Sequence, residues 1–157
     1  AGALSNSLPF TVKTAVTSVT ISPASPVLAS FGATHQFQAT AKNASGETVA
    51  GKSFAWVSSS TSIASVDTTG LVRAAGNGEV TITATVDGVS ATATVKVTQA
   101  VATIAVSPAS AALASLEATQ PFSAELRDAN GNAVTNQTVT WSSGTPAVRC
   151  ESYAESH

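Results

Sequence analysis

The sequence predicts an all-β protein built as a sandwich of short antiparallel strands. Composition is the first reason, because Ala, Ser, Thr and Val occupy 92 of the 157 positions while charged residues make up 10%. Apolar and hydroxyl-bearing side chains also alternate along several segments, which places them on opposite faces of a strand. Glycine-containing turns separate these segments at the short spacing that is typical of a sandwich.

Six strands are expected between residues 16 and 100. The clearest is 79–86, where Val80 and Ile82 alternate with threonines, so that one face is apolar and the other is wet. The expected strands are residues 17–22, 34–42, 53–58, 71–74, 79–86 and 90–98. Turns are expected at residues 43–46, 68–70, 76–78 and 87–88, where glycine can adopt a positive φ.

A repeat of 85 residues organises the chain. Residues 19–25 return as residues 104–110, and the offset continues without a gap. Residues 16–63 and 101–148 share 17 identical positions of 48, which chance does not produce over an ungapped run. The expected fold is therefore one complete module followed by a truncated second copy.

Four segments follow from this repeat. Residues 16–100 are expected to form the complete module, and residues 101–148 the first half of a second one. Residues 1–15 are interpreted as the closing strand of a preceding domain or a linker. Residues 149–157 do not match the repeat. They are interpreted as a tail foreign to it, with a functional extension as the alternative.

Inward-facing residues of the strands define the expected core. Because the chain has one cysteine, no disulfide can form within it, and stability has to come from packing. The expected core of the complete module is Val19, Ile21, Phe37, Phe54, Trp56, Val66, Leu71, Val80, Ile82, Val95 and Val97. Phe122 and Trp141 hold the positions of Phe37 and Trp56 in the second copy and are expected to be core residues there.

Several motifs in a fixed order resemble a known family. They are Ser22-Pro-Ala24, Phe37-Gln-Ala39, Gly46, Trp56-Val-Ser-Ser59, Ile63-Ala-Ser-Val-Asp67, Gly70-Leu-Val72, Gly76 and Ile82-Thr-Ala84. In this order and spacing they resemble the bacterial immunoglobulin-like domain, group 2, over residues 16–100 and the first half of the second copy. The resemblance implies an immunoglobulin-like β-sandwich, in which Trp56 takes the place of the central core tryptophan.

The resemblance also implies where such a module works. Members of the family usually occur as tandem modules in secreted or surface-anchored bacterial proteins, so an extracellular or cell-surface location is expected. The implied function is a non-enzymatic structural or adhesion module, a spacer whose partners are neighbouring Ig-like modules of the same chain. An accessory carbohydrate-binding module of an extracellular polysaccharide-active enzyme is the alternative. A hydrolase with an unrecognised site is the third candidate.

The residues themselves offer little for catalysis or metal binding. No G-x-S-x-G nucleophile motif is present, and His35, the one histidine of the repeat, aligns with Gln120. Residues 128–132 begin like a calcium loop but lack the remaining oxygen ligands, and the matching residues 43–46 carry no charge. A plain turn is the preferred interpretation. No catalytic residue, cofactor or metal is therefore expected.

Charge and hydropathy exclude some classes of partner and leave others open. Seven basic and nine acidic residues give no electrostatic footprint for nucleic acid, and the short apolar runs predict no membrane insertion. A polysaccharide or a host or cell-surface ligand is kept as a candidate partner. Phe31 is the one candidate for an exposed aromatic platform, but its alignment with Leu116 indicates a packing role. The incomplete second copy would leave an open sheet edge, so self-association through it is expected.

Overall fold

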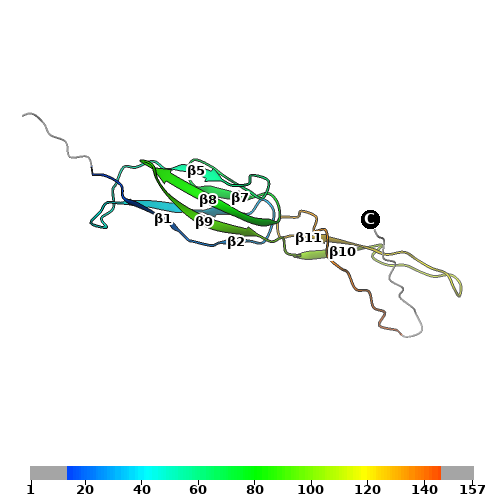
Figure 1. The fold of residues 1–157 in the computed structure, drawn as a ribbon. Helices are drawn as coiled ribbons and strands as arrows, with labels where there is room; N and C mark the ends of the chain where they lie inside the picture. Colours follow the sequence, from blue (N-terminus) through cyan, green and yellow to red (C-terminus); the bar gives the residue numbers. More distant parts are fainter. Residues whose placement is uncertain (1–13, 146–157) are drawn as a thin grey trace, which may run out of the picture. The chain divides into compact units, whose positions relative to one another are not determined.

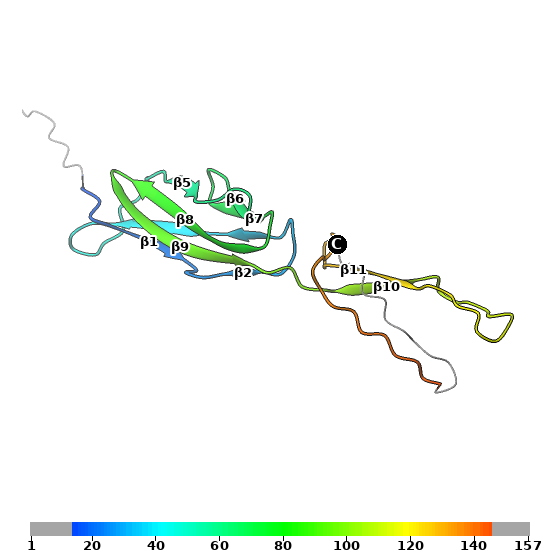
Figure 2. The same ribbon diagram turned by 45° about the vertical axis from the view of Figure 1, so that its right-hand side comes forward.

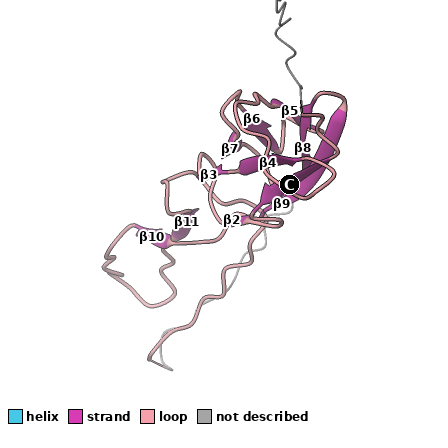
Figure 3. Ribbon diagram, turned by 90° about the vertical axis from the view of Figure 1, so that its left-hand side faces the viewer, coloured by secondary structure: helices cyan, strands magenta, loops and turns pink. Residues whose placement is uncertain are grey.

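A computed structural model of the chain describes residues 14–145. This part consists of strands and loops, and Figure 3 shows no helix in it, which confirms the all-β prediction. The chain divides into two compact units, Ala1–Thr98 and Gln99–His157. The closing strand expected in residues 1–15 lies almost entirely outside the described residues, and the tail expected at residues 149–157 lies wholly outside them.

The first unit carries strands β1 to β9 (Figure 1). Their bounds are β1 (Ser18–Ser22), β2 (Val27–Leu28), β3 (Thr34–Gln36), β4 (Gln38–Lys42), β5 (Ala55–Ser58), β6 (Ala64–Val66), β7 (Leu71–Ala74), β8 (Gly78–Val86) and β9 (Val89–Val97). One sheet has the order β2-β9-β8-β5 and another has the order β3-β7-β6. The remaining pair is β1 with β4.

The core of the first unit lies between these sheets. On β8 the side chains of Val80, Ile82, Ala84 and Val86 are buried, as the period of two predicts. Strand β9 pairs with β8 antiparallel, and its inward-facing residues include Val95 opposite Val80. The buried cluster contains Leu28, Phe37, Ala64, Val72, Ala74, Val80, Ile82, Ala93, Val95 and Val97. Apart from Phe37, its members come from β2, β8 and β9 of one sheet and from β6 and β7 of another, so the cluster is where the two sheets pack together.

The segment expected as one strand over residues 34–42 is two strands. β3 pairs with β7, and β4 pairs with β1, so the chain changes partner at Phe37. The N–H of Phe37 donates to the carbonyl of Gly70 at 3.0 Å, and its side chain is 1% exposed. Phe37 therefore anchors the point at which one segment crosses from one sheet to the other.

Leu71 is the expected core residue that the structure moves to the surface. Its side chain is 37% exposed, whereas its neighbour Val72 is fully buried. Val72 lies opposite Val66 and His35 in the flanking strands, so the inward face of β7 is that of residues 72 and 74. Because successive side chains of a strand alternate, Leu71 faces outward, and its assignment to the core was wrong.

The second unit repeats the first hairpin of the first unit. Strands β10 (Thr103–Ser107) and β11 (Ser123–Arg127) pair antiparallel. Their register, with Thr103 opposite Arg127, is that of Ser18 opposite Lys42 shifted by 85 residues. The turn after this pair is also repeated, because Gly46 and Gly131 both have a φ of 81°.

The aromatic residues expected in a second core do not form one. Phe122 is 44% exposed, although its counterpart Phe37 is 1% exposed, and Trp141 is 36% exposed. The buried cluster of the first unit draws half of its members from β8 and β9. Within residues 99–145 no strand stands in the place of β8 or β9, so the inward face of β10 and β11 has nothing to pack against.

Candidate functional site

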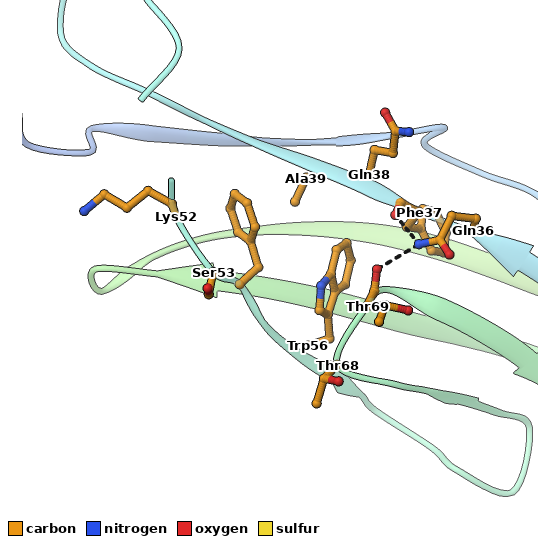
Figure 4. Close-up of a pocket in the computed structure, with 10 residues that line it drawn as sticks. Gln36, Phe37, Gln38, Ala39, Lys52, Ser53, Trp56, Thr68 and Thr69 are labelled. Carbon is orange, nitrogen blue, oxygen red and sulfur yellow. Dashed lines mark hydrogen bonds between the residues drawn. The ribbon is translucent and has the colours of Figure 1, made fainter. Parts of the chain in front are cut away.

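The first unit has an open groove beside Trp56, with a volume of about 500 Å³. Three segments meet there: the crossing from β3 to β4, the chain entering β5, and the turn between β6 and β7 (Figure 4). The lining residues are Gln36, Phe37, Gln38, Ala39, Lys52, Ser53, Phe54, Trp56, Thr68 and Thr69. We refer to this set as the Trp56 groove.

Aromatic rings form the apolar part of the Trp56 groove. The rings of Phe37 and Trp56 are stacked with centroids 6.3 Å apart and an angle of 26° between their planes. Phe54 lies at 6.5 Å from Trp56, tilted by 53°. Phe37 is buried, whereas Phe54 and Trp56 are half-buried. The row of rings therefore runs from the buried Phe37 to Phe54, which packs beside a second buried cluster.

Gly70 sets the position of the indole. A Cβ atom at this residue would lie 2.8 Å from Cζ2 of Trp56 and 3.0 Å from the carbonyl oxygen of Phe37, closer than side chains pack. The φ of Gly70 is +84°, in the left-handed region that favours glycine. The glycine lets the β6–β7 turn lie directly against the ring.

Hydrogen bonds fix the polar wall of the groove. The amide nitrogen of Gln36 donates to the carbonyl oxygens of Phe37 and Thr69, both at 2.8 Å (Figure 4). The Asp67 carboxylate accepts bonds from the hydroxyl and N–H of Thr69 and from the N–H of Leu71. These bonds, that of the Thr69 hydroxyl first, lower the pKa of Asp67 below the ordinary value of 3.8. The turn that carries Thr68 and Thr69 is thus held from both sides.

Lys52 is the one titratable side chain that lines the groove. Its ammonium forms an ion pair with the carboxylate of Asp87, and Figure 4 shows it pointing away from Trp56. The positive charge of Lys52 is therefore neutralised by Asp87, which does not line the groove. The other lining residues are aromatic, amide, hydroxyl or alanine side chains. The groove can hold a ligand by stacking and neutral hydrogen bonds, and it offers no acid–base pair for bond cleavage.

The fold and the motifs have a match among known families. A family model, described as the bacterial Ig-like domain (group 2), matches residues 15–97. The chain belongs to this family. The match covers β1 to β9 and hence the whole Trp56 groove, which therefore belongs to an Ig-like module.

Solved structures with a similar fold are S-layer proteins. The S-layer protein rSbsC(31-844) has 21% identity and a TM-score of 0.50, over 81% of this chain and 18% of that one. Domains 4 and 5 of SbsC have 20% identity and a TM-score of 0.48, over 55% of this chain and 54% of that one. This chain thus spans about half or less of these structures, and at these identities the likeness concerns the fold. No curated protein matches.

His35 lies on the core side of the Ig-like module. Its ring contacts Phe37 edge-on with centroids 5.3 Å apart, and its Nε2 atom is buried without a hydrogen-bond partner among the described residues. His35 does not line the Trp56 groove. Its place on the inward face of β3, opposite Val72, gives it a packing role.

The turn that resembled a calcium loop is closed by its own hydrogen bonds. One oxygen of Asp128 accepts the N–H groups of Asn130 and Asn132, both at 2.9 Å, and the other accepts the side-chain amide of Gln99 at 3.0 Å. Within residues 14–145 no group of three or more His, Cys, Asp or Glu side chains is arranged to hold a metal ion. The same residues include no helix with the length and hydropathy needed to cross a membrane.

The sequence located the aromatic part of the groove but not the groove itself. Phe37, Phe54 and Trp56 were expected in the core. All three line the groove, and Phe54 and Trp56 are partly exposed there because β5 is the edge strand of its sheet. Phe31, the one candidate for a platform, packs against the buried cluster, as its alignment with Leu116 predicts. The missed lining residues are Gln36, Gln38, Ala39, Lys52, Ser53, Thr68 and Thr69.

A comparison of the two copies contains a signal for the missed residues. The fold-determining positions recur, with Phe37 matched by Phe122 and Trp56 by Trp141. Several other groove positions change, with Gln36 replaced by Pro121, Lys52 by Gln137 and Phe54 by Val139. The pattern shared by the two copies therefore does not fix the side chains that give the groove its chemistry.

Proposed function

We propose that the chain is a non-enzymatic structural module, a spacer or adhesion unit, in a secreted or cell-surface bacterial protein. The observation that carries the proposal is the path of the chain through the first unit. Figures 1 and 2 show the chain entering at the end where β1 begins and leaving at the opposite end, where β9 stops. A module with this geometry holds the segments joined to its two ends apart by its own length.

Membership of the bacterial Ig-like family supports this proposal. The solved structures of similar fold are multi-domain S-layer chains, which is consistent with partners that are neighbouring Ig-like modules. The groove of the module lacks paired titratable groups, which favours binding or spacing over hydrolysis.

A second partner is proposed for the second unit. Its exposed apolar residues include Ile104, Leu113 and Phe122, and β10 and β11 pair only with each other within the described residues. Open strand edges and uncovered apolar faces recruit other strands. We infer that the second unit self-associates, or accepts a strand from another chain, unless closing strands complete it.

A display experiment tests the spacer function. A small binding domain is carried on a bacterial surface at the outer end of zero, one, two or three copies of residues 14–98. We expect its height above the membrane, measured by energy transfer to a membrane dye, to rise by an equal increment for each copy. A height that does not grow with copy number would contradict the spacer function.

A further inference from the structure

We propose that the Trp56 groove binds a neutral carbohydrate chain, which is a function beyond spacing. The groove combines partly exposed aromatic surface with uncharged amides and hydroxyls on a wall already fixed by hydrogen bonds. A pyranose ring has an apolar face of C–H groups and an edge of hydroxyls, and this combination complements both parts of the groove.

The aromatic part of the groove is organised before a ligand arrives. The indole of Trp56 stacks on the buried ring of Phe37, and Gly70 lies directly against it. These two contacts fix its orientation. Phe54 extends the apolar surface outward from Trp56 at a tilt of 53°. Rings held in place lose little conformational entropy on binding, so they are suited to stacking on a flexible, strongly hydrated ligand.

The polar part of the groove is suited to hydroxyl groups. The side-chain nitrogen of Gln36 donates to two backbone carbonyls, so the side-chain oxygen of Gln36 can accept a hydrogen bond from a ligand. Thr68 adds a hydroxyl that can both donate and accept, and the indole N–H of Trp56 can donate. In Figure 4 the indole nitrogen lies on the edge of the ring turned toward Ser53. Donors and acceptors are therefore mixed around the rings.

Charge selects against an ionised ligand. The ammonium of Lys52 is paired with Asp87, and it is turned away from Trp56. An anionic sugar would find no unpaired cation among the lining residues, and a cationic one would find no carboxylate there. A neutral ligand needs neither.

Two strand edges border the groove, those of β4 and β5, and both are too short for a peptide strand. The free edge of β5 has four residues, Ala55–Ser58. β4 pairs with β1 on one side, and on the other side its end is already covered, because Thr48 bridges Lys42 and the N–H of Val49 donates to Ala41. Three residues, 38–40, are left open on that side. Strand addition needs a longer run of backbone bonds, so the groove favours a ligand held by side chains.

Affinity electrophoresis of the whole chain tests the proposal, in gels containing dextran, galactomannan or mixed-linkage β-glucan, with anionic polygalacturonate in a parallel gel. Emission of Trp56 is followed in a Trp141→Phe background, so that the signal comes from the groove. We expect at least one neutral polysaccharide to retard the chain and to shift the Trp56 emission, and polygalacturonate to do neither.

Matched variants come from the repeat itself. Phe54→Val introduces the residue that the second copy carries at this position, and we expect it to weaken binding roughly 3- to 10-fold. Phe31→Leu makes the corresponding change at an aromatic residue outside the groove, and we expect unchanged binding. Lys52→Gln, also taken from the second copy, should retain binding because the ligand is neutral.

Several results would overturn the proposal. They are the absence of retardation and of an emission change with all three neutral polysaccharides, binding of polygalacturonate alone, and equal losses in Phe54→Val and Phe31→Leu. Loss of binding in Lys52→Gln with an unchanged melting temperature would also overturn it, because the site would then depend on the ammonium that the structure turns away from Trp56. None of these results would bear on the spacer function, which does not depend on the groove.

Discussion

The two copies of the repeat begin alike and end differently. β1 with β4 and β10 with β11 share one register, and the turns after them share the same glycine conformation. Phe37 is nevertheless buried in the first copy, whereas Phe122 is almost half exposed in the second. Identical residues at identical places in a hairpin thus have different surroundings.

The difference shows which features the hairpin residues determine by themselves and which features need the rest of the sandwich. The turns at Asn43 and Asp128 are each closed by a side-chain oxygen that accepts two backbone N–H groups within the same turn. Such bonds are local, and they form in both copies. Burial of an aromatic side chain is not local, because it needs the facing strands β8 and β9. About half of the repeat therefore suffices for the turn and the pairing but not for the core.

Completing the second copy should remove the difference, and this is the largest effect we expect. Residues 61–98, grafted in place of residues 146–157, would supply the equivalents of β6 to β9 in register. We expect a second cooperative unfolding transition, with a free energy of unfolding of about 5 kcal/mol or more. Denaturant titration followed by Trp141 emission measures it.

Light scattering on the same set of chains tests the inferred self-association. The whole chain should associate, whereas residues 14–100 alone and the grafted chain should be monomeric. A monomeric whole chain would show that the exposed face of the second unit does not recruit a partner.

Paired alanine substitutions should sharpen the comparison. Phe37→Ala is expected to lower the free energy of unfolding of the first unit by about 3–5 kcal/mol, because it leaves a cavity in a packed core. Phe122→Ala should change stability by about 0.5 kcal/mol or less, as an exposed side chain does. Urea titrations of both variants check this, and similar losses in the two would mean that the second unit has a core.

Gly70→Ala tests the fit of the β6–β7 turn against the indole. The added Cβ would meet Trp56 at 2.8 Å, so we expect a loss of about 1–3 kcal/mol. Gly46→Ala is the matched control, since Gly46 has a similar φ of +81° and nothing within 4 Å. Its cost should be about 1 kcal/mol or less. Equal costs in thermal melts would mean that the loss at Gly70 comes from φ alone.

Asp67 should give the first unit a small dependence of stability on acid pH. Its pKa is lowered in the folded state, so the ionised form stabilises the fold above the ordinary value of 3.8. This contribution is lost as the pH falls below that value and through the lowered folded pKa. Asp67→Asn should flatten the fall in melting temperature below about pH 4. An unchanged acid profile would show that the Asp67 bonds add nothing to stability.

The sequence predicted the long strands and missed β2 and β6, of two and three residues, for a physical reason. β8 and β9 alternate over nine residues each, so their period is visible without any knowledge of their neighbours. β2 has two residues and is a strand only because Val27 and Leu28 lie beside Lys96 and Val97. Which side chains of β7 face inward was misassigned at Leu71. This too depends on pairing partners that are distant in sequence.

The groove could not be predicted from the sequence for a similar reason. Phe54 and Trp56 alternate with polar or small residues like any pair of core side chains, and their partial exposure results from β5 being an edge strand. Thr68 and Thr69 join them only through the β6–β7 turn. The order of strands in a sheet depends on the whole fold, whereas alternation depends on a few residues at a time.

The short strand β2 has a consequence for how the module responds to tension. It runs parallel to β9, and the N–H groups of Thr94, Lys96 and Thr98 donate to the carbonyls of Ala24, Pro26 and Leu28 at 3.1, 3.1 and 2.9 Å. Pulling the two ends of the module apart would slide these strands along each other, so the three bonds are sheared together instead of being unzipped in turn. Rupture under such loading is governed by the unfolding rate. We therefore expect this two-residue strand to resist separation of the two ends of the module.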